Sequence, residues 1–277
     1  MKKLFITDLD GTLLNRESLV SDTSAQIISN LSNRGINITV ATARTPATVE
    51  PLLYKTITNP PAVVMTGAAL WDRQKLQFID PIYIEPLATE KITATCCRFG
   101  INPFIYSIVD NKIVDTRFFG QPTPNEQKFI NQRNNLTLKQ ISTHPHISLS
   151  QIASQNNTIL IFALGTTTQI SRLAEALRAE NAYSISAYSD NLNPSISYIE
   201  IFAPGVDKAS AIKKLKTKTG AQHLTVFGDN LNDLPMMAVA DVAIAVENAL
   251  PQVKEAADIV IGSHDCDSVA RYIESVI

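Results

Sequence analysis

The sequence predicts an α/β protein: a doubly wound parallel sheet with a second, α+β domain inserted into it. Short β-branched runs recur along the chain, and segments of helical pattern lie between them. The runs are continuously apolar rather than alternating, which is typical of strands buried on both faces of a parallel sheet. The middle of the chain has a different pattern, and this predicts the insertion.

Alternation of strands and helices favours a doubly wound sheet over an antiparallel one. Helices are expected at 23–34, 207–218 and 250–256. The expected strands of the sheet are 4–7, 36–41, 62–66, 198–202, 224–227, 241–246 and 258–261.

The inserted domain is expected over residues 84–190, which are rich in Asn, Gln, Thr and Pro. Residues 104–119 have a hairpin pattern with Asp110-Asn111 as the turn, and 158–165 predict a strand that leads into a helix. We therefore expect a core formed by 1–83 and 191–277, interrupted by this α+β domain.

Composition limits the classes of function. The 277 residues are 45% hydrophobic and carry a net charge of −2, which is typical of a globular protein and gives no sign of nucleic-acid binding. No apolar run approaches the ~18 residues of a membrane span. The three cysteines form neither a metal-binding spacing nor a disulfide framework. These observations predict a cytoplasmic protein without nucleic-acid or membrane partners, and they leave the oligomeric state open.

Polar residues follow several of the predicted strands at their carboxyl ends, where open parallel sheets bind ligands. If these strands share one sheet, the side chains converge on one site. The segments are Asp8-Leu9-Asp10-Gly11-Thr12, Ala41-Thr42-Ala43-Arg44, Asp207-Lys208 and Gly228-Asp229-Asn230-Leu231-Asn232-Asp233.

The residue types at these strand ends favour metal-assisted phosphoryl transfer. Four carboxylates in one crevice repel each other unless a cation such as Mg²⁺ neutralises them. Lys208 offers a compact charge for a phosphate, Thr12 and Thr42 offer hydroxyls, and Gly11 lets backbone N–H groups approach an anion. The carboxylates are Asp8, Asp10, Asp229 and Asp233.

Each motif alone has a structural explanation. An Asp-x-Asp-Gly sequence is common in turns, Thr42 or Asp229 alone suits a turn or a cap, and a lysine that opens a helix is usually solvated. The functional interpretation depends on all of them occurring at strand ends in one chain.

These motifs resemble those of the haloacid dehalogenase-like (HAD) hydrolase superfamily. The matching residues are DLDGTLL, the Thr of ATAR, Lys208 and GDNLND. The tail ADVAIAVENALPQVKEAADIVI resembles the Cof-type branch, which carries a large α+β (C2-type) cap between the second and third motifs of a Rossmann-like core. The resemblance covers the whole chain.

The resemblance implies a role for each acid. Asp8 would be the nucleophile that forms an aspartyl-phosphate, and Asp10 the general acid and then the base. Mg²⁺ would be held by the carboxylates of Asp8 and Asp229 and by the backbone oxygen of Asp10, with Asp233 orienting the site. Phosphoryl oxygens would be bound by Thr42, Lys208, Asn232 and backbone groups near Leu9 and Ala43.

The implied activity is a Mg²⁺-dependent phosphatase acting on small phosphomonoesters, such as sugar phosphates or phosphorylated cofactors. A phosphosugar mutase and a catalytically inactive phosphometabolite-binding protein are the alternatives. The sequence does not identify the substrate or the cap residues that select it. It departs from the common branch pattern at Thr66, where Asn is frequent, and at Ala43, Ala209 and Glu247, where Gly is common.

Overall fold

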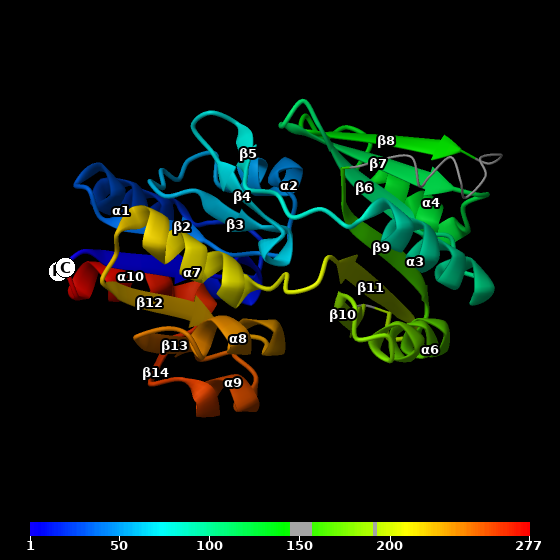
Figure 1. The fold of residues 1–277 in the computed structure, drawn as a ribbon. Coiled ribbons are helices and arrows are strands. Elements are labelled where there is room, and N and C mark those ends of the chain that lie inside the picture. Colours follow the sequence, from blue (N-terminus) through cyan, green and yellow to red (C-terminus); the bar gives the residue numbers. More distant parts are fainter. Residues whose placement is uncertain (145–156, 191–192) are drawn as a thin grey trace. The chain divides into compact units, whose positions relative to one another are not determined.

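The computed structural model describes residues 1–144, 157–190 and 193–277 (Figure 1). The chain divides into two compact units. The first comprises Met1–Asp80 and Asp207–Ile277, and the second comprises Pro81–Val206. The sequence predicted an insertion over residues 84–190. The second unit begins three residues before that range and ends sixteen residues after it.

The first unit contains a five-stranded, entirely parallel sheet, which confirms the predicted fold class. The interior strand β1, which lies between β12 and β2, has its Leu4, Phe5 and Ile6 side chains almost fully buried, because neighbouring strands and helices cover it. The order is β14 (Ile259–Ile261), β13 (Val242–Val246), β12 (His223–Gly228), β1 (Lys3–Thr7) and β2 (Asn37–Val40).

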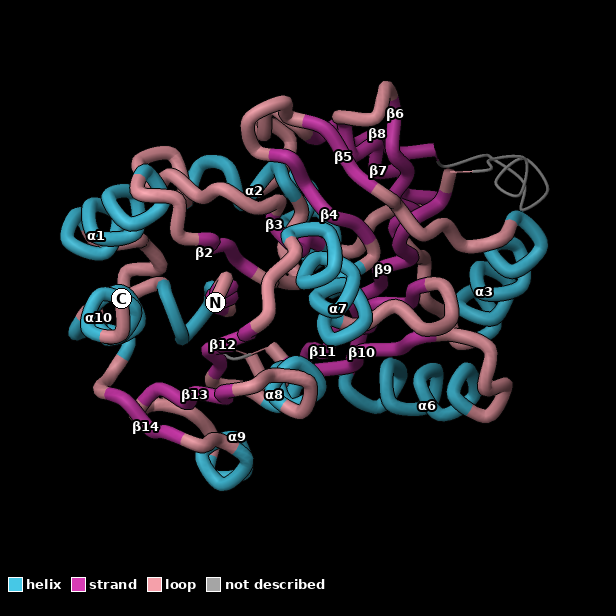
Figure 2. The backbone as a smooth tube through the Cα atoms, turned by 60° about the vertical axis from the view of Figure 1, so that its left-hand side comes forward, coloured by secondary structure: helices cyan, strands magenta, loops and turns pink. Residues whose placement is uncertain are grey.

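Helices cover both faces of this sheet. Figure 2 shows α1 and α10 on one face and α7 and α8 on the other. Among the described residues, no helix combines the length and apolarity that crossing a membrane requires. The helices of this unit are α1 (Asp22–Asn33), α2 (Pro46–Leu52), α7 (Lys208–Thr219), α8 (Leu234–Met237), α9 (Pro251–Ala256) and α10 (Ser268–Ser275).

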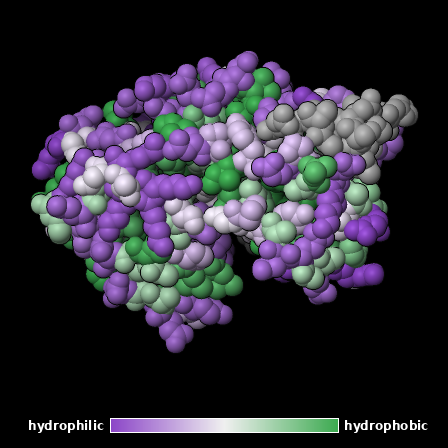
Figure 3. All heavy atoms as spheres, viewed as in Figure 1, coloured by the Kyte–Doolittle hydropathy of each residue, from purple (hydrophilic) through white to green (hydrophobic). Residues whose placement is uncertain are grey.

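The strand β14 forms one edge of the parallel sheet, and part of its surface is apolar. Ile259 and Val260 are both exposed, and hydrophobic spheres gather over this region in Figure 3.

Two strands expected in the parallel sheet lie elsewhere. The run 62–66 forms β3 (Ala62–Val64), which pairs antiparallel with β4 (Ala69–Asp72); β5 (Gln77–Ile79) completes this small sheet. A single parallel bridge between Ala41 and Val63 joins it to the chain that follows β2.

The second correction concerns the run 198–202. It forms β11 (Ile196–Phe202), which pairs with β9 and β10 in the sheet of the second unit. An apolar strand such as β11 can be buried in either sheet. Its apolar sequence therefore did not reveal which strands it pairs with.

The second unit has a six-stranded sheet, antiparallel except for the pair β7 and β8. The predicted hairpin is present, and Asp110 and Asn111 form its turn with positive φ angles. The strand order is β10 (Ser184–Ser189), β11, β9 (Thr158–Thr166), β6 (Phe104–Val109), β7 (Ile113–Phe119) and β8 (Lys139–His144). The helices are α3 (Pro86–Arg98), α4 (Pro124–Asn131) and α6 (Thr167–Arg178).

An aromatic cluster forms part of the core of the second unit. Phe104 is fully buried, and its ring centroid lies 4.6 Å from that of Phe118 and 5.0 Å from that of Phe129. Phe162 is stacked on Phe129 at 4.9 Å. The cluster joins strands β6, β7 and β9 to helix α4.

Replacing Phe104 by alanine should therefore lower the free energy of unfolding by about 3–5 kcal/mol, since the cavity left among fixed neighbours cannot collapse completely. Urea denaturation followed by far-UV circular dichroism measures the change. The control is Leu87→Ala, at a position that is 80% exposed, which should change the free energy by less than about 0.5 kcal/mol. Equal effects of the two substitutions would contradict this description of the core.

Candidate active site

Asp8 directly follows the carboxyl end of the interior strand β1. Its backbone N–H donates to the carbonyl oxygen of Phe227 in β12 at 2.9 Å, so the pairing of β1 with β12 continues to this residue. The Asp8 side chain is only 9% exposed. The residue that the sequence predicts as the nucleophile is therefore held at the carboxyl end of an interior strand, beside β12.

The turn after Asp8 requires a glycine. Gly11 has a φ of +78°, and a Cβ atom placed on it would lie 2.5 Å from Oδ2 of Asp229. Thr12 donates through Oγ1 to Oδ1 of Asp229 at 2.8 Å. This turn thereby brings the segment after β1 against the carboxylate after β12.

Lys208 is the first residue of α7, and its side chain is fully buried. Its Nζ donates to Oδ1 of Asp8 at 2.5 Å and to Oδ1 of Asp233 at 2.7 Å. Asp207 caps the helix by accepting the N–H of Ser210 at 2.6 Å. The cap fixes the start of α7 and with it the origin of the lysine side chain.

Asp233 is completely buried and organises the loop after β12. Its Oδ2 accepts the backbone N–H groups of Asp229 at 3.1 Å and Asn230 at 3.2 Å, while its Oδ1 accepts from Lys208. A Cβ atom on Gly228 would lie 2.6 Å from that of Asp233. Only glycine fits at this strand end.

Three carboxylates of this cluster can serve as ligands of a hard cation. Asp8, Asp229 and Asp233 each offer an oxygen, and these oxygens all lie within 4.8 Å of one another. One lysine does not balance three ionised acids. The oxygen donor set and the excess negative charge fit a divalent cation such as Mg²⁺.

The electrostatics of the protein without metal agree with this interpretation. Burial raises the pKa of Asp8 to about 8, although Lys208 opposes the rise, and burial raises the pKa of Asp229 to about 6. Burial disfavours the charge on Lys208, but Asp8 and Asp233 outweigh it and hold the lysine pKa above its ordinary value. Burial therefore disfavours the ionised forms of Asp8 and Asp229, and a bound cation would favour them.

Asp10 differs from Asp8 in its surroundings. Its side chain is 53% exposed and forms an ion pair with Arg44, with nitrogen–oxygen distances of 2.7 and 2.6 Å. The carboxylate of Asp10 is thus held by an arginine, whereas that of Asp8 is held by the buried lysine.

The predicted phosphate-binding residues besides Lys208 also lie in the first unit. Thr42 is buried after β2, where its Oγ1 accepts the N–H of Arg44 at 3.1 Å. Leu9 is buried, Ala43 is half-buried, and Asn232 is exposed in the turn Leu231–Asp233. Their phosphate contacts stay predictions.

Sequence reasoning assigned no role to two polar residues near the cluster. One is Arg44, the partner of Asp10. The other is Asn248, whose Nδ2 donates to the carbonyl oxygen of Gly11 at 2.7 Å and whose Oδ1 accepts the N–H of His264 at 3.1 Å. Asn248 follows the carboxyl end of β13, and this position in the sequence could have indicated that it lies near the site.

Of the residues that depart from the common Cof-type pattern, Thr66 adopts a backbone conformation that is unusual for its type. Thr66 has a φ of +57° and a ψ of +20°, a conformation that asparagine adopts more readily than a β-branched residue. Ala209 is buried in α7, and Glu247 is exposed.

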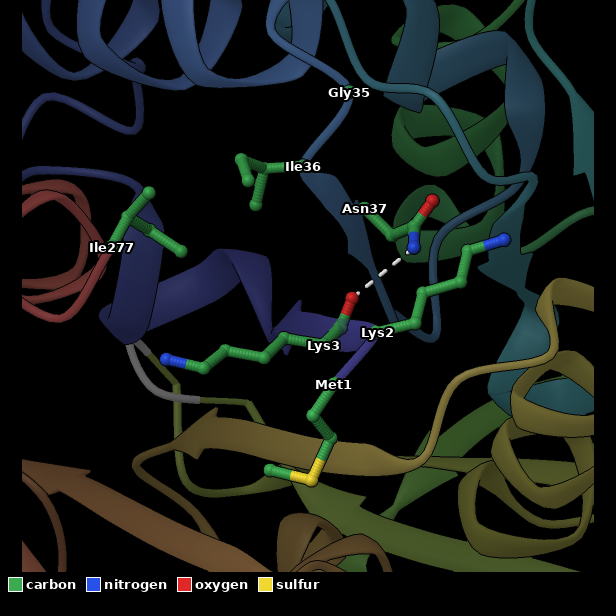
Figure 4. A pocket seen from close by; sticks show the side chains of 7 residues that line it. All are labelled: Met1, Lys2, Lys3, Gly35, Ile36, Asn37 and Ile277. Atoms are coloured by element: carbon green, nitrogen blue, oxygen red, sulfur yellow. Dashed lines mark hydrogen bonds between the residues drawn. The ribbon is translucent and has the colours of Figure 1, made fainter.

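A hollow of about 310 Å³ lies at the opposite edge of the sheet, at the amino ends of β1 and β2 (Figure 4). Asn37 donates to the carbonyl oxygen of Lys3 at its wall. None of the acidic cluster lines it, so it is separate from the candidate active site. The lining residues are Met1, Lys2, Lys3, Gly35, Ile36, Asn37 and Ile277.

Comparisons with known proteins agree with this geometry. Residues 5–273 match the family model described as haloacid dehalogenase-like hydrolase. Pyridoxal phosphate phosphatase YbhA of Escherichia coli is 24% identical over 99% of this chain and 98% of its own. The 5-amino-6-(5-phospho-D-ribitylamino)uracil phosphatase YcsE of Bacillus subtilis is 25% identical over 98% of this chain and 94% of its own.

A crystal structure from Thermotoga maritima has a similar fold, with a TM-score of 0.78 and 25% identity over 100% of this chain and 98% of that one. The match of the family model spans nearly all of the sequence, from the first strand to the last helix. The chain belongs to the haloacid dehalogenase-like hydrolase family.

Proposed function

We propose that this hydrolase is a Mg²⁺-dependent, cytoplasmic phosphatase of small phosphomonoesters, such as sugar phosphates or phosphorylated cofactors. The observation that carries the proposal is the buried contact of Lys208 with Asp8, beside the carboxylates of Asp229 and Asp233. Relatives named as phosphatases of pyridoxal phosphate and of a phosphoribitylaminouracil support the reaction class.

Asp8 would attack the phosphorus atom through a carboxylate oxygen to form an aspartyl-phosphate. Its burial and its pairing with β12 keep that oxygen in one place, which favours an in-line approach. Lys208 would reduce the repulsion between the carboxylate and the incoming phosphate, because its charge lies 2.5 Å from Oδ1 of Asp8.

Asp10 would transfer the protons. In the first step it would donate a proton to the leaving oxygen of the ester. In the second step it would take a proton from water, whose oxygen attacks phosphorus, so that Asp8 leaves as a carboxylate and inorganic phosphate is released. Its exposed side chain suits a group that must meet both substrate and water.

Asp8, Asp229 and the backbone oxygen of Asp10 would hold the metal, with Asp233 orienting the loop. When bound, Mg²⁺ neutralises negative charge on the carboxylates and on the phosphoryl group. Thr42, Asn232 and backbone groups near Leu9 and Ala43 would hold the phosphoryl oxygens together with Lys208.

The second unit would act as the cap that selects the leaving group. Its residues would then decide which phosphorylated metabolite is hydrolysed.

A screen of phosphorylated metabolites for phosphate release tests the proposal. Mg²⁺ should support turnover, EDTA should abolish it, and Ca²⁺ should support it poorly because its looser coordination disturbs in-line geometry. The metal-stripped enzyme should regain activity with Mg²⁺, and Asp8→Asn should stay inactive.

Full activity after metal removal, or activity in Asp8→Asn, would contradict the proposed chemistry. Product analysis separates the alternatives: a phosphate group moved within the substrate indicates a mutase. Binding of phosphorylated metabolites without turnover indicates an inactive binding protein.

Asp10→Asn should separate the two steps. With p-nitrophenyl phosphate, whose leaving group hardly needs a proton, phosphoryl transfer to Asp8 should persist while hydrolysis slows. We expect a burst of about one nitrophenolate per active site, followed by a slow phase. Intact-mass analysis after an acid quench should find one added phosphoryl group, and peptide mapping should locate it on Asp8. A phosphoryl group on another residue would show that the roles are wrongly assigned.

Stabilisation by Mg²⁺ should increase with pH. The pKa values of about 8 for Asp8 and about 6 for Asp229 lie above the unfolded values, so folding disfavours their ionised forms. The metal-free protein should therefore lose stability as pH rises from about 4 to 8. Because Mg²⁺ binds the ionised carboxylates, the rise in Tm that it causes should be larger at pH 8.5 than at pH 5.5.

Thermal unfolding with and without Mg²⁺ at the two pH values measures this difference. Asp229→Asn should reduce the shift, whereas Asp265→Asn, at a carboxylate paired with Arg16 outside the cluster, should leave it unchanged. A shift of equal size at both pH values would argue against a metal site made of these acids.

A further inference from the structure

The ion pair between Arg44 and Asp10 has two hydrogen bonds. Nε of Arg44 donates to Oδ2 of Asp10 at 2.7 Å, and Nη2 donates to Oδ1 at 2.6 Å. Each carboxylate oxygen thus accepts one N–H from the same planar guanidinium. Such a pair fixes the plane of the carboxylate, which a lysine at this position could not do.

The backbone of Arg44 is held on both sides before its side chain reaches Asp10. Its N–H donates to Oγ1 of Thr42 at 3.1 Å, and its carbonyl oxygen accepts the N–H of Met65 at 3.0 Å. Thr42 itself is buried at the end of β2. The guanidinium therefore starts from an anchored loop rather than from a free surface segment.

Stability does not account for this pair. The side chains of Arg44 and Asp10 are 31% and 53% exposed, and ion pairs with such exposure contribute little to folding. A comparable pair, Arg16 with Asp265, lies outside the acidic cluster and has an Nε–Oδ2 distance of 3.0 Å. The distinguishing feature of Arg44 is its partner, which is two residues from Asp8.

We propose that Arg44 is a positioning residue that holds the Asp10 carboxylate for the second step, in which Asp10 takes a proton from water. This inference rests on the proposed function. In that step Asp10 begins without a proton, and both of its oxygens can accept from Arg44 as the structure shows. A second lone pair on either oxygen remains for the proton of water.

The first step depends less on the same contact. Asp10 then carries the proton that it gives to the leaving oxygen, and the protonated oxygen is a poorer acceptor for an arginine N–H. Arg44 should therefore support hydrolysis of the aspartyl-phosphate more than its formation. The proton of water moves to Asp10, the water oxygen bonds to phosphorus, and the bond from phosphorus to the Asp8 oxygen breaks.

The test is pre-steady-state kinetics of Arg44→Met with p-nitrophenyl phosphate and Mg²⁺. We expect kcat to fall by about 10- to 100-fold, because a misplaced proton acceptor slows the reaction without removing it. A burst near one nitrophenolate per site should precede the slow phase, and the phosphorylated protein should accumulate in quenched samples. KM should not increase.

Two further variants complete the experiment. Arg44→Lys, which keeps the charge but loses the two-point contact, should have an intermediate rate and burst. Arg16→Met removes an arginine from the comparable ion pair outside the cluster and should match the wild type. If circular dichroism shows that Arg44→Met is not folded, Arg44→Lys carries the same test.

A rate for Arg44→Met equal to that of Arg16→Met would overturn the inference, as would a slow rate without a burst. An increase in KM with unchanged kcat would also overturn it, because Arg44 would then bind substrate instead of positioning Asp10. If the wild type hydrolyses no phosphomonoester, or if Asp10→Asn forms no phosphoenzyme on Asp8, the proposed function fails and this inference fails with it.

Discussion

The buried contact of Lys208 with Asp8 and Asp233 is the interaction on which the rest of the site depends. A charged group without solvent destabilises a fold strongly unless it is paired and hydrogen-bonded. Here the lysine is fully buried and donates to both acids. The contact therefore joins the end of β1, the start of α7 and the loop after β12, and loss of Lys208 would leave two buried acids without their cationic partner.

Close backbone approach makes this clustering possible. Gly11 and Gly228 both lie where a Cβ atom would come within 3 Å of an aspartate side chain, of Asp229 and of Asp233 respectively. A glycine beside each acidic strand end, after Asp10 in one case and before Asp229 in the other, is thus a steric requirement of the acidic cluster. The same crowding raises the pKa values of Asp8 and Asp229 through burial, so the site that holds the acids together also favours a cation between them.

The sequence predicted the parallel sheet and the cluster of Asp8 and Asp229 because β1 and β12 are continuously apolar and end in polar turns. Lys208 was predicted at the site because it follows the apolar run 198–202, which was expected in the parallel sheet, and this reason holds only in part. Its preceding strand, β11, belongs to the other sheet, and the capped start of α7 places the lysine instead. Arg44 was missed as the partner of Asp10, since hydrophobic periodicity carries no information on where a loop side chain points.

The turn after β1 gives two acids, one residue apart, opposite surroundings. Asp8 is 9% exposed and held by a lysine that contacts a second acid, whereas Asp10 is 53% exposed and held by Arg44. A nucleophile benefits from a fixed position and few water contacts, while a group that exchanges protons with substrate and water needs access to both. Two carboxylates of similar intrinsic acidity can therefore take different roles, because the fold buries one and leaves the other at the surface of its unit.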